Sequence, residues 1–198
     1  LTSNPGMIDG LMDSLVLDRL PDREFLATTL QELCRAAEDL DPILHAFKND
    51  QQLRVGVREL LGKEDVLATT TALSQIAEVC LNQIAQREYD RLVAKYGQPL
   101  MAEGRRKGKP AEFAILAMGK LGGQEMNYHS DLDLVFLFEA EGHTDAPPAK
   151  ATSNQHFFSE LGQRIIKRTS RLSSYGRLYE VDARLRPTPR RVDGSRCR

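Results

Sequence analysis

The sequence predicts an α+β fold, in which a helical amino-terminal region is followed by a small mixed sheet with flanking helices. Apolar residues recur at three- to four-residue spacing through residues 1–100, which is typical of amphipathic helices. The pattern then changes to short apolar or alternating runs, which are typical of strands. We therefore expect a helical region over residues 1–110, an α/β core over 111–188 and an atypical tail over 189–198.

Three helices are expected in the helical region. Asp22 is placed to cap the first, and Asp41-Pro42 fits an N-cap and a first helical position for the second. The third helix is expected from about Asp65 to Tyr96. Their apolar stripes indicate either a helical core or a partner surface, and the core is the simpler interpretation. The stripes of the first two helices include Phe25, Leu26, Leu30, Leu33, Leu44, Phe47, Leu60 and Leu61.

Strand-like runs follow the basic segment GRRKGKP (104–110), which we expect to be a solvated loop. FAILAM (113–118) and DLDLVFLF (131–138) are continuously apolar, as expected of strands covered on both faces. LYEVDARLR (178–186) alternates and is expected to be a third strand, with Leu178 and Asp182 on one face and Tyr179 on the other.

A further helix is expected between the second and third strands, from about Ser153 to Leu172. Its cationic side chains would face either phosphate or water, and water is the default interpretation. These residues are Arg164, Lys167, Arg168 and Arg171.

Bulk composition narrows the class of protein. The chain has 198 residues, 41% hydrophobic and 28% charged, and a net charge of −1, which gives no argument for nucleic-acid or membrane-surface binding. Cys34, Cys80 and Cys197 are too widely spaced for a zinc cluster or disulfide framework, which suits a reducing cytoplasm. No apolar run approaches the ~20 residues of a membrane span. Because the chain opens with Leu1, we expect a fragment.

The segment MGKLGGQEMNYHSDLDLVFLF (118–138) places two acids at the head of an apolar run. In an extended segment Asp131 and Asp133 share a face, about 7 Å apart, and would repel one another. A hard divalent cation relieves that repulsion, because carboxylate oxygens are its preferred ligands. Asp182 lies in the next expected strand and adds a third carboxylate. Three carboxylates on adjacent strands would hold two ions that clamp the oxygens of a phosphoryl transfer.

The residues around these acids suit a phosphate ligand. Gly122 and Gly123 would let the backbone approach a ligand and direct N–H groups at phosphate oxygens. Ser130 would add a hydroxyl donor, and Lys120 would neutralise phosphate charge. Together these residues predict a nucleoside triphosphate with Mg²⁺ or Mn²⁺, although a Gly-Gly pair or an Asp-x-Asp pair alone is a weak signal.

These residues resemble the nucleotidyltransferase superfamily that includes DNA polymerase beta, which has a Gly-Gly or Gly-Ser turn, an acidic pair and a later third acid. GKLGGQEMNYHSDLDLVFLF and LYEVDARLRPT are similar to signature segments of one of its families, the glutamate–ammonia-ligase (glutamine synthetase) adenylyltransferases. The resemblance is specific in those two segments and looser elsewhere. It implies a nucleotidyltransferase-type mixed sheet, and a cytoplasmic enzyme that regulates nitrogen assimilation.

The resemblance also implies roles for individual residues. Asp131, Asp133 and Asp182 would be the catalytic and metal-binding acids. Gly122, Gly123, Ser130 and Lys120 would bind ATP, whereas Arg184 and Arg186 would either bind phosphate or pair with the acids.

Family proteins carry two such domains, one that adds AMP to a tyrosine of glutamine synthetase and one that removes it by phosphorolysis. The segments here resemble the adding half more closely. The implied partners are glutamine synthetase and a PII signalling protein, with no nucleic acid and no membrane.

The sequence departs from the family pattern after RLRPT, where Pro189 and RRVDGSRCR follow. We therefore expect a core that is incomplete at its carboxyl-terminal side. Two alternatives to AMP transfer stay open: phosphorolytic removal of AMP, and a catalytically incomplete fragment that only docks on a partner.

Overall fold

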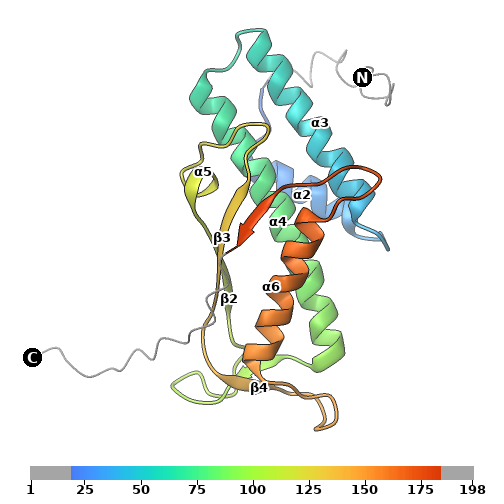
Figure 1. The fold of residues 1–198 in the computed structure, drawn as a ribbon, viewed down its shortest axis with the longest axis vertical. Coiled ribbons are helices and arrows are strands. Elements are labelled where there is room, and N and C mark those ends of the chain that lie inside the picture. Colours follow the sequence, from blue (N-terminus) through green and yellow to red (C-terminus); the bar gives the residue numbers. More distant parts are fainter. Residues whose placement is uncertain (1–18, 184–198) are drawn as a thin grey trace, which may run out of the picture.

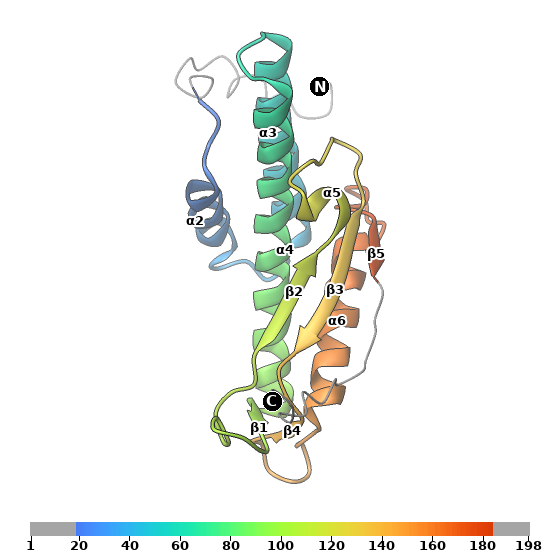
Figure 2. The same cartoon turned by 90° about the vertical axis from the view of Figure 1, so that its left-hand side faces the viewer.

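The computed structural model describes residues 19–183, and it confirms the expected α+β fold (Figures 1 and 2). The chain runs through α2 (Arg23–Cys34), α3 (Asp41–Leu60) and α4 (Val66–Tyr96) before it reaches β1 (Pro99–Met101) and β2 (Phe113–Ala117). A single helical turn, α5 (Gly119–Gly122), leads to β3 (Leu132–Phe138) and β4 (Gly142–Thr144). The described part ends with α6 (Asn154–Ser170) and β5 (Val181–Ala183).

Three of the helices begin where the sequence predicts. The side chains of Asp22, Asp65 and Ser153 accept hydrogen bonds from the backbone N–H three residues later, at 2.8, 2.7 and 3.2 Å. Each bond satisfies a donor that the first helical turn leaves without a partner. The predicted N-cap role of Asp41 is wrong, because Asp41 is already the first helical residue and Leu40 precedes it as the cap. The Asp41 carboxylate instead pairs with arginines of α6.

The apolar stripes of the helical region form a core. Helix α4 is buried on several sides between residues 72 and 81, and it packs against α2 and α3 on one side and α6 on the other (Figure 2). The stripes of α2 and α3 are only partly covered, since Phe25 and Leu33 are 55% and 53% exposed and Leu60 is 89% exposed. One continuous core joins residues of the helical region to residues of the α/β core, including Leu26, Leu44, Leu73, Ile84, Leu132, Phe157 and Ile165.

The central sheet has the order β2-β3-β5, with β2 antiparallel and β5 parallel to β3. Helices α4 and α6 cover one face, where Phe158 of α6 stacks on the rings of Phe113 and Phe138 (Figure 2). The prediction that the first two strands are covered on both faces is wrong. Leu116 and Leu137 are 50% and 49% exposed, because no described element covers the second face.

The third predicted strand is shorter than expected in the part of the chain that the structure describes. Regular pairing is limited to β5, and the expected alternation fails just before it, because Leu178 and Tyr179 are both buried. Strands β1 and β4 were not predicted, and they pair with each other antiparallel near the carboxyl-terminal end of α4 (Figure 2). The basic loop 104–110 is exposed as predicted. Within residues 19–183, no helix has the length and apolar character needed to cross a bilayer.

The helical region holds the turn between α5 and β3. Ser74 of α4 donates its hydroxyl to Thr70 O at 2.8 Å and accepts the backbone N–H of Met126 at 3.3 Å. Both Ser74 and Met126 are buried, so this bond replaces solvent for the Met126 N–H. It joins α4 to the segment that leads into the acidic pair.

We expect Ser74→Ala to lower the free energy of unfolding by about 1–3 kcal/mol, because it leaves the buried Met126 N–H without an acceptor. The matched control is Ser170→Ala, since the Ser170 hydroxyl only donates to Ile166 O within its own helix. The control is expected to change stability by less than about 0.5 kcal/mol. Urea unfolding of both variants measures the difference, and equal losses would contradict the role given to the Ser74–Met126 bond.

Candidate active site

Two of the three predicted acids lie side by side on the open face of the sheet. In the parallel pairing of β3 with β5, Asp133 is the register partner of Asp182. Leu132 and Leu134 flank Asp133 in β3 and are buried against the helices, so the Asp133 side chain lies on the opposite face. Asp133 and Asp182, together with Met118, Leu134 and Val135, line a cavity of about 200 Å³.

The third predicted acid, Asp131, lies outside the cavity that Asp133 and Asp182 line. Asp131 precedes β3, is exposed, and does not line this cavity. Among residues 19–183, no three His, Cys, Asp or Glu side chains are arranged so that they could hold a metal ion together. Carboxylates are the right ligands for Mg²⁺ or Mn²⁺. The Asp133–Asp182 pair therefore fits such an ion by its chemistry, and a third carboxylate ligand would require the Asp131 side chain to move toward the pair.

The turn that contains the Gly-Gly pair also brings Gly119 close to the acids, a residue that was not predicted to belong to the site. Gly119 begins α5 with φ +52°, and a Cβ at this position would overlap Asp133 Oδ2. A Cβ on Gly122 would lie 2.5 Å from Ala117 O. Glycine is required at both positions by close approach, and at Gly119 also by the left-handed backbone. The feature of the sequence that could have identified Gly119 was its position shortly before the Gly-Gly pair.

The N–H groups expected to cradle phosphate are engaged within the chain. Gly122 N–H donates to Met118 O and Gly123 N–H donates to Gly119 O, both at 3.0 Å. Phosphate binding by these two groups stays a prediction, and it would require those bonds to open.

The other predicted phosphate ligands surround the turn. Ser130 is buried, and its hydroxyl donates to Asn127 Oδ1 and accepts Asn127 N–H, each at 3.0 Å, so it orders the turn before Asp131. Lys120 is exposed on α5. Arg184 and Arg186 lie outside the described residues, and their two interpretations stay open.

Side chains of α3 contact the segments that lead into β3 and β5, and these contacts could not be read from the sequence. Lys48 Nζ donates to Leu178 O at 2.7 Å and lies 4.6 Å from the ring centre of Tyr179, just before β5. Burial lowers the pKa of Lys48. Glu59, near the end of α3, accepts a 2.8 Å hydrogen bond from the Tyr128 hydroxyl. Helix α3 therefore contacts both segments that carry the acids.

The chain is similar to known proteins over most of its length. A family model described as glutamate-ammonia ligase adenylyltransferase matches residues 1–192. The chain is 38% identical over 194 residues to the bifunctional glutamine synthetase adenylyltransferase/adenylyl-removing enzyme of Thioalkalivibrio sulfidiphilus, covering 95% of this chain and 20% of that protein. Enzymes with the same description from Psychromonas ingrahamii and Bradyrhizobium diazoefficiens are 33% and 34% identical, over 94% and 96% of this chain and 20% and 19% of theirs.

These matches place the chain among proteins related to adenylyltransferases, a class of transferases. It belongs to the glutamate–ammonia ligase adenylyltransferase family. The resemblance in the two signature segments is thereby confirmed. The chain spans about a fifth of the length of the curated relatives it matches.

We expect Gly119→Ala to displace the Asp133 carboxylate, because the added methyl group would overlap Oδ2. The matched control is Gly108→Ala, where φ is +75° but no atom lies within 4 Å of the added Cβ. Both variants should lose about 1–2 kcal/mol of stability from the left-handed backbone. Only Gly119→Ala should weaken Mn²⁺ binding, measured by water-proton relaxation. Equal Mn²⁺ affinity in the two variants would contradict the contact.

The Tyr128–Glu59 hydrogen bond should make stability depend on pH in the alkaline range. Burial and the Glu59 hydrogen bond raise the pKa of Tyr128 from 10.0 to about 12. Between these values the unfolded chain has lost the tyrosine proton and the folded chain retains it, so stability falls as pH rises. We expect Tyr128→Phe to lose about 1 kcal/mol at neutral pH.

The Tyr128→Phe variant should also show a shallower fall in stability between pH 10 and 12. Urea unfolding across this range measures the slope. Tyr175→Phe is the control, because Tyr175 is 57% exposed and its hydroxyl makes no hydrogen bond within the described chain. A slope unchanged by Tyr128→Phe would refute the coupling.

Proposed function

We propose that this chain carries a nucleotidyltransferase site that transfers AMP from ATP to a tyrosine hydroxyl of glutamine synthetase. The observation that carries the proposal is the register pairing of Asp133 with Asp182 at a cavity on the open face of the sheet. Membership of the family supports the reaction class, and the names of the relatives support the protein substrate. The proposed setting is the cytoplasm, with a PII protein as a regulatory partner.

The proposed reaction is a displacement at the α-phosphorus of ATP. The acceptor oxygen forms a bond to phosphorus, the bond to the β-phosphate bridging oxygen breaks, and pyrophosphate leaves. The tyrosine proton moves to a carboxylate, for which Asp182 is the proposed acceptor because it is exposed at the cavity. Asp131, Asp133 and Asp182 would hold Mg²⁺ or Mn²⁺, which supplies positive charge against the phosphate oxygens.

The remaining residues would position the nucleotide. Lys120 is exposed beside Gly122 and Gly123 and is the proposed counter-charge for the triphosphate. Ser130 would act by ordering the turn that carries Asp131. Met118 and Val135 provide the apolar lining of the cavity and exclude water from one side of the acids.

A second candidate is the reverse chemistry, phosphorolysis of an adenylyl-tyrosine. It is favoured by the description of the relatives as both adenylyltransferases and adenylyl-removing enzymes. The chain covers about a fifth of the length of those enzymes, and a single site would carry only one of their two activities. A third candidate, a docking fragment without activity, follows from the same coverage.

We expect the chain to transfer label from α-phosphate-labelled ATP to glutamine synthetase in the presence of Mg²⁺ or Mn²⁺. Asp133→Asn and Asp182→Asn should each reduce the rate by at least about 100-fold, because each removes a charge that the transition state requires. Asp90→Asn is the matched control, since Asp90 is exposed on α4 and contacts only Gln86 among the described residues.

Other outcomes separate the candidates. ADP release from adenylylated glutamine synthetase and phosphate, without transfer from ATP, would favour the reverse reaction. Retained binding to glutamine synthetase with neither activity would favour the docking fragment. Transfer that survives both aspartate substitutions would refute the proposed site.

A further inference from the structure

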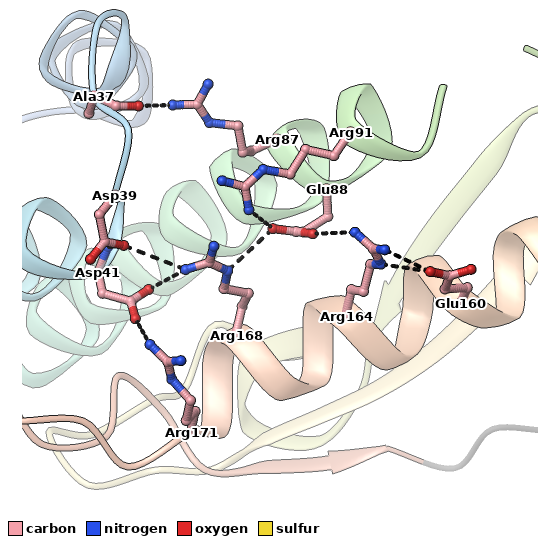
Figure 3. Close-up of polar contacts among 10 residues, drawn as sticks. All are labelled: Ala37, Asp39, Asp41, Arg87, Glu88, Arg91, Glu160, Arg164, Arg168 and Arg171. Atoms are coloured by element: carbon pink, nitrogen blue, oxygen red, sulfur yellow. Dashed lines mark hydrogen bonds and ion pairs between the residues drawn. The ribbon is translucent and has the colours of Figure 1, made fainter. Parts of the chain in front are cut away.

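A second cavity lies on the helical side of the molecule, lined by α4, α6 and the residue that follows α6. Its volume is about 380 Å³, at the lower end of the ~300–1,000 Å³ of small-molecule sites. Asp133 and Asp182 do not line this cavity; they lie in β3 and β5, on the open face of the sheet. All but one of the lining residues are cationic: the exception is Glu88, and the others are Arg91, Arg164, Lys167, Arg168 and Arg171. Figure 3 shows Arg91, Arg164 and Arg168 around Glu88.

Glu88 is a buried carboxylate that holds three of these arginines. It is 4% exposed, and its Oε1 lies 2.7 Å from Arg91 Nη1 and 3.3 Å from Arg168 Nε. Its Oε2 lies 3.4 Å from Arg164 Nη1. A buried carboxylate is stable only when it is paired in this way. The three guanidinium groups are therefore fixed around one point on α4 (Figure 3).

Three further acids pair with arginines of this cavity: Glu160, Asp41 and Asp39, whose Oδ1 lies 3.6 Å from Arg168 Nη1. Glu160 accepts hydrogen bonds from Arg164 Nε and Nη2 at 3.1 and 2.7 Å. Asp41, the first residue of α3, accepts a 2.8 Å bond from Arg168 Nη1 and pairs with Arg171. Water is the default environment expected from the sequence for the cationic side chains of α6 and for Arg171. This expectation is wrong for Arg164, Arg168 and Arg171, because each of them pairs with a carboxylate.

The fixed arginines still present unused donors. Among the described residues, Arg91 is engaged through Nη1 alone and Arg171 through Nη2 alone, although each guanidinium carries five N–H donors. Lys167 is exposed at the cavity and has no hydrogen-bond or ion-pair partner among residues 19–183. The cavity therefore presents several charge-assisted donors that are already ordered, which lowers the entropic cost of binding an anion.

We propose that this cavity binds the diphosphate group of a small molecule, at a site separate from the Asp133–Asp182 pair. A diphosphate offers several oxygens to the N–H groups of Arg91 and Arg171 that have no partner among the described residues, and its charge is complementary to the unpaired ammonium group of Lys167. Arginine fits this ligand because its planar group binds phosphate oxygens in pairs. The group would come either from free pyrophosphate or from a nucleoside diphosphate.

The test is titration calorimetry of the chain with pyrophosphate in EDTA, where no divalent ion is available to bridge phosphate to Asp133 and Asp182. We expect a single site whose affinity falls by at least about tenfold in Lys167→Glu and in Arg91→Gln, since each removes a charged donor. Lys107→Glu is the matched control, because it makes the same charge change in the exposed 104–110 loop. Circular dichroism and urea unfolding confirm that each variant is folded.

Parallel titrations with ADP and sulfate identify the ligand. Binding of ADP as tight as that of pyrophosphate indicates a nucleoside diphosphate, and tighter pyrophosphate binding indicates the free ion. No heat with either, sulfate binding of equal affinity, or equal losses in Lys167→Glu and Lys107→Glu would overturn the proposal. Asp182→Asn should leave pyrophosphate affinity unchanged in EDTA, and a large loss in that variant would assign the binding to the open face of the sheet instead.

Discussion

The structure depends on the burial of α4 around most of its circumference. Between residues 72 and 81 most side chains are buried, which a helix lying on a single surface cannot achieve. Helices α2 and α3 must cover one side, and α6 the other (Figure 2). The helical region is thus the second layer of the core that supports the sheet, and Ser74 connects that layer directly to the turn before the acids.

Local signals in the sequence predicted the helices well, because the deciding contacts lie within a few residues. The caps at Asp22, Asp65 and Ser153 depend on a backbone N–H three positions away. Long-range pairing left no such signal. Strands β1 and β4 are each three residues long and pair across about forty residues. Asp41 pairs with Arg168, which lies 127 residues later in the chain. The exposure of Leu116 and Leu137 was also unpredictable, because an apolar run does not reveal what covers it.

The residues of the candidate site also include some that local sequence patterns predicted and others that depend on long-range contacts. The two-residue period of strands predicted a shared face for Asp131 and Asp133 and placed Asp182 in the next strand, and the structure brings Asp133 and Asp182 into register. Gly119 and Lys48 could not be identified, since their importance lies in contacts with Asp133 and with Leu178, 14 and 130 residues away. Local spacing therefore identified the chemical groups of the site, whereas the residues that position those groups required the tertiary structure.

The helical period of α6 directs its apolar side chains to one side and its arginines to another. Its apolar residues, such as Leu161 and Ile165, pack in the core, while Arg164 and Arg168 extend toward α4 and the cationic cavity. Thr169 follows directly, and its carbonyl accepts a 3.0 Å hydrogen bond from Tyr179 N–H, just before β5. An anion bound by Lys167 and Arg171 would therefore contact the helix end that is hydrogen-bonded to the segment just before the Asp182 strand. Because a packed interior deforms little, we expect a shift of that helix end to move the strand as well.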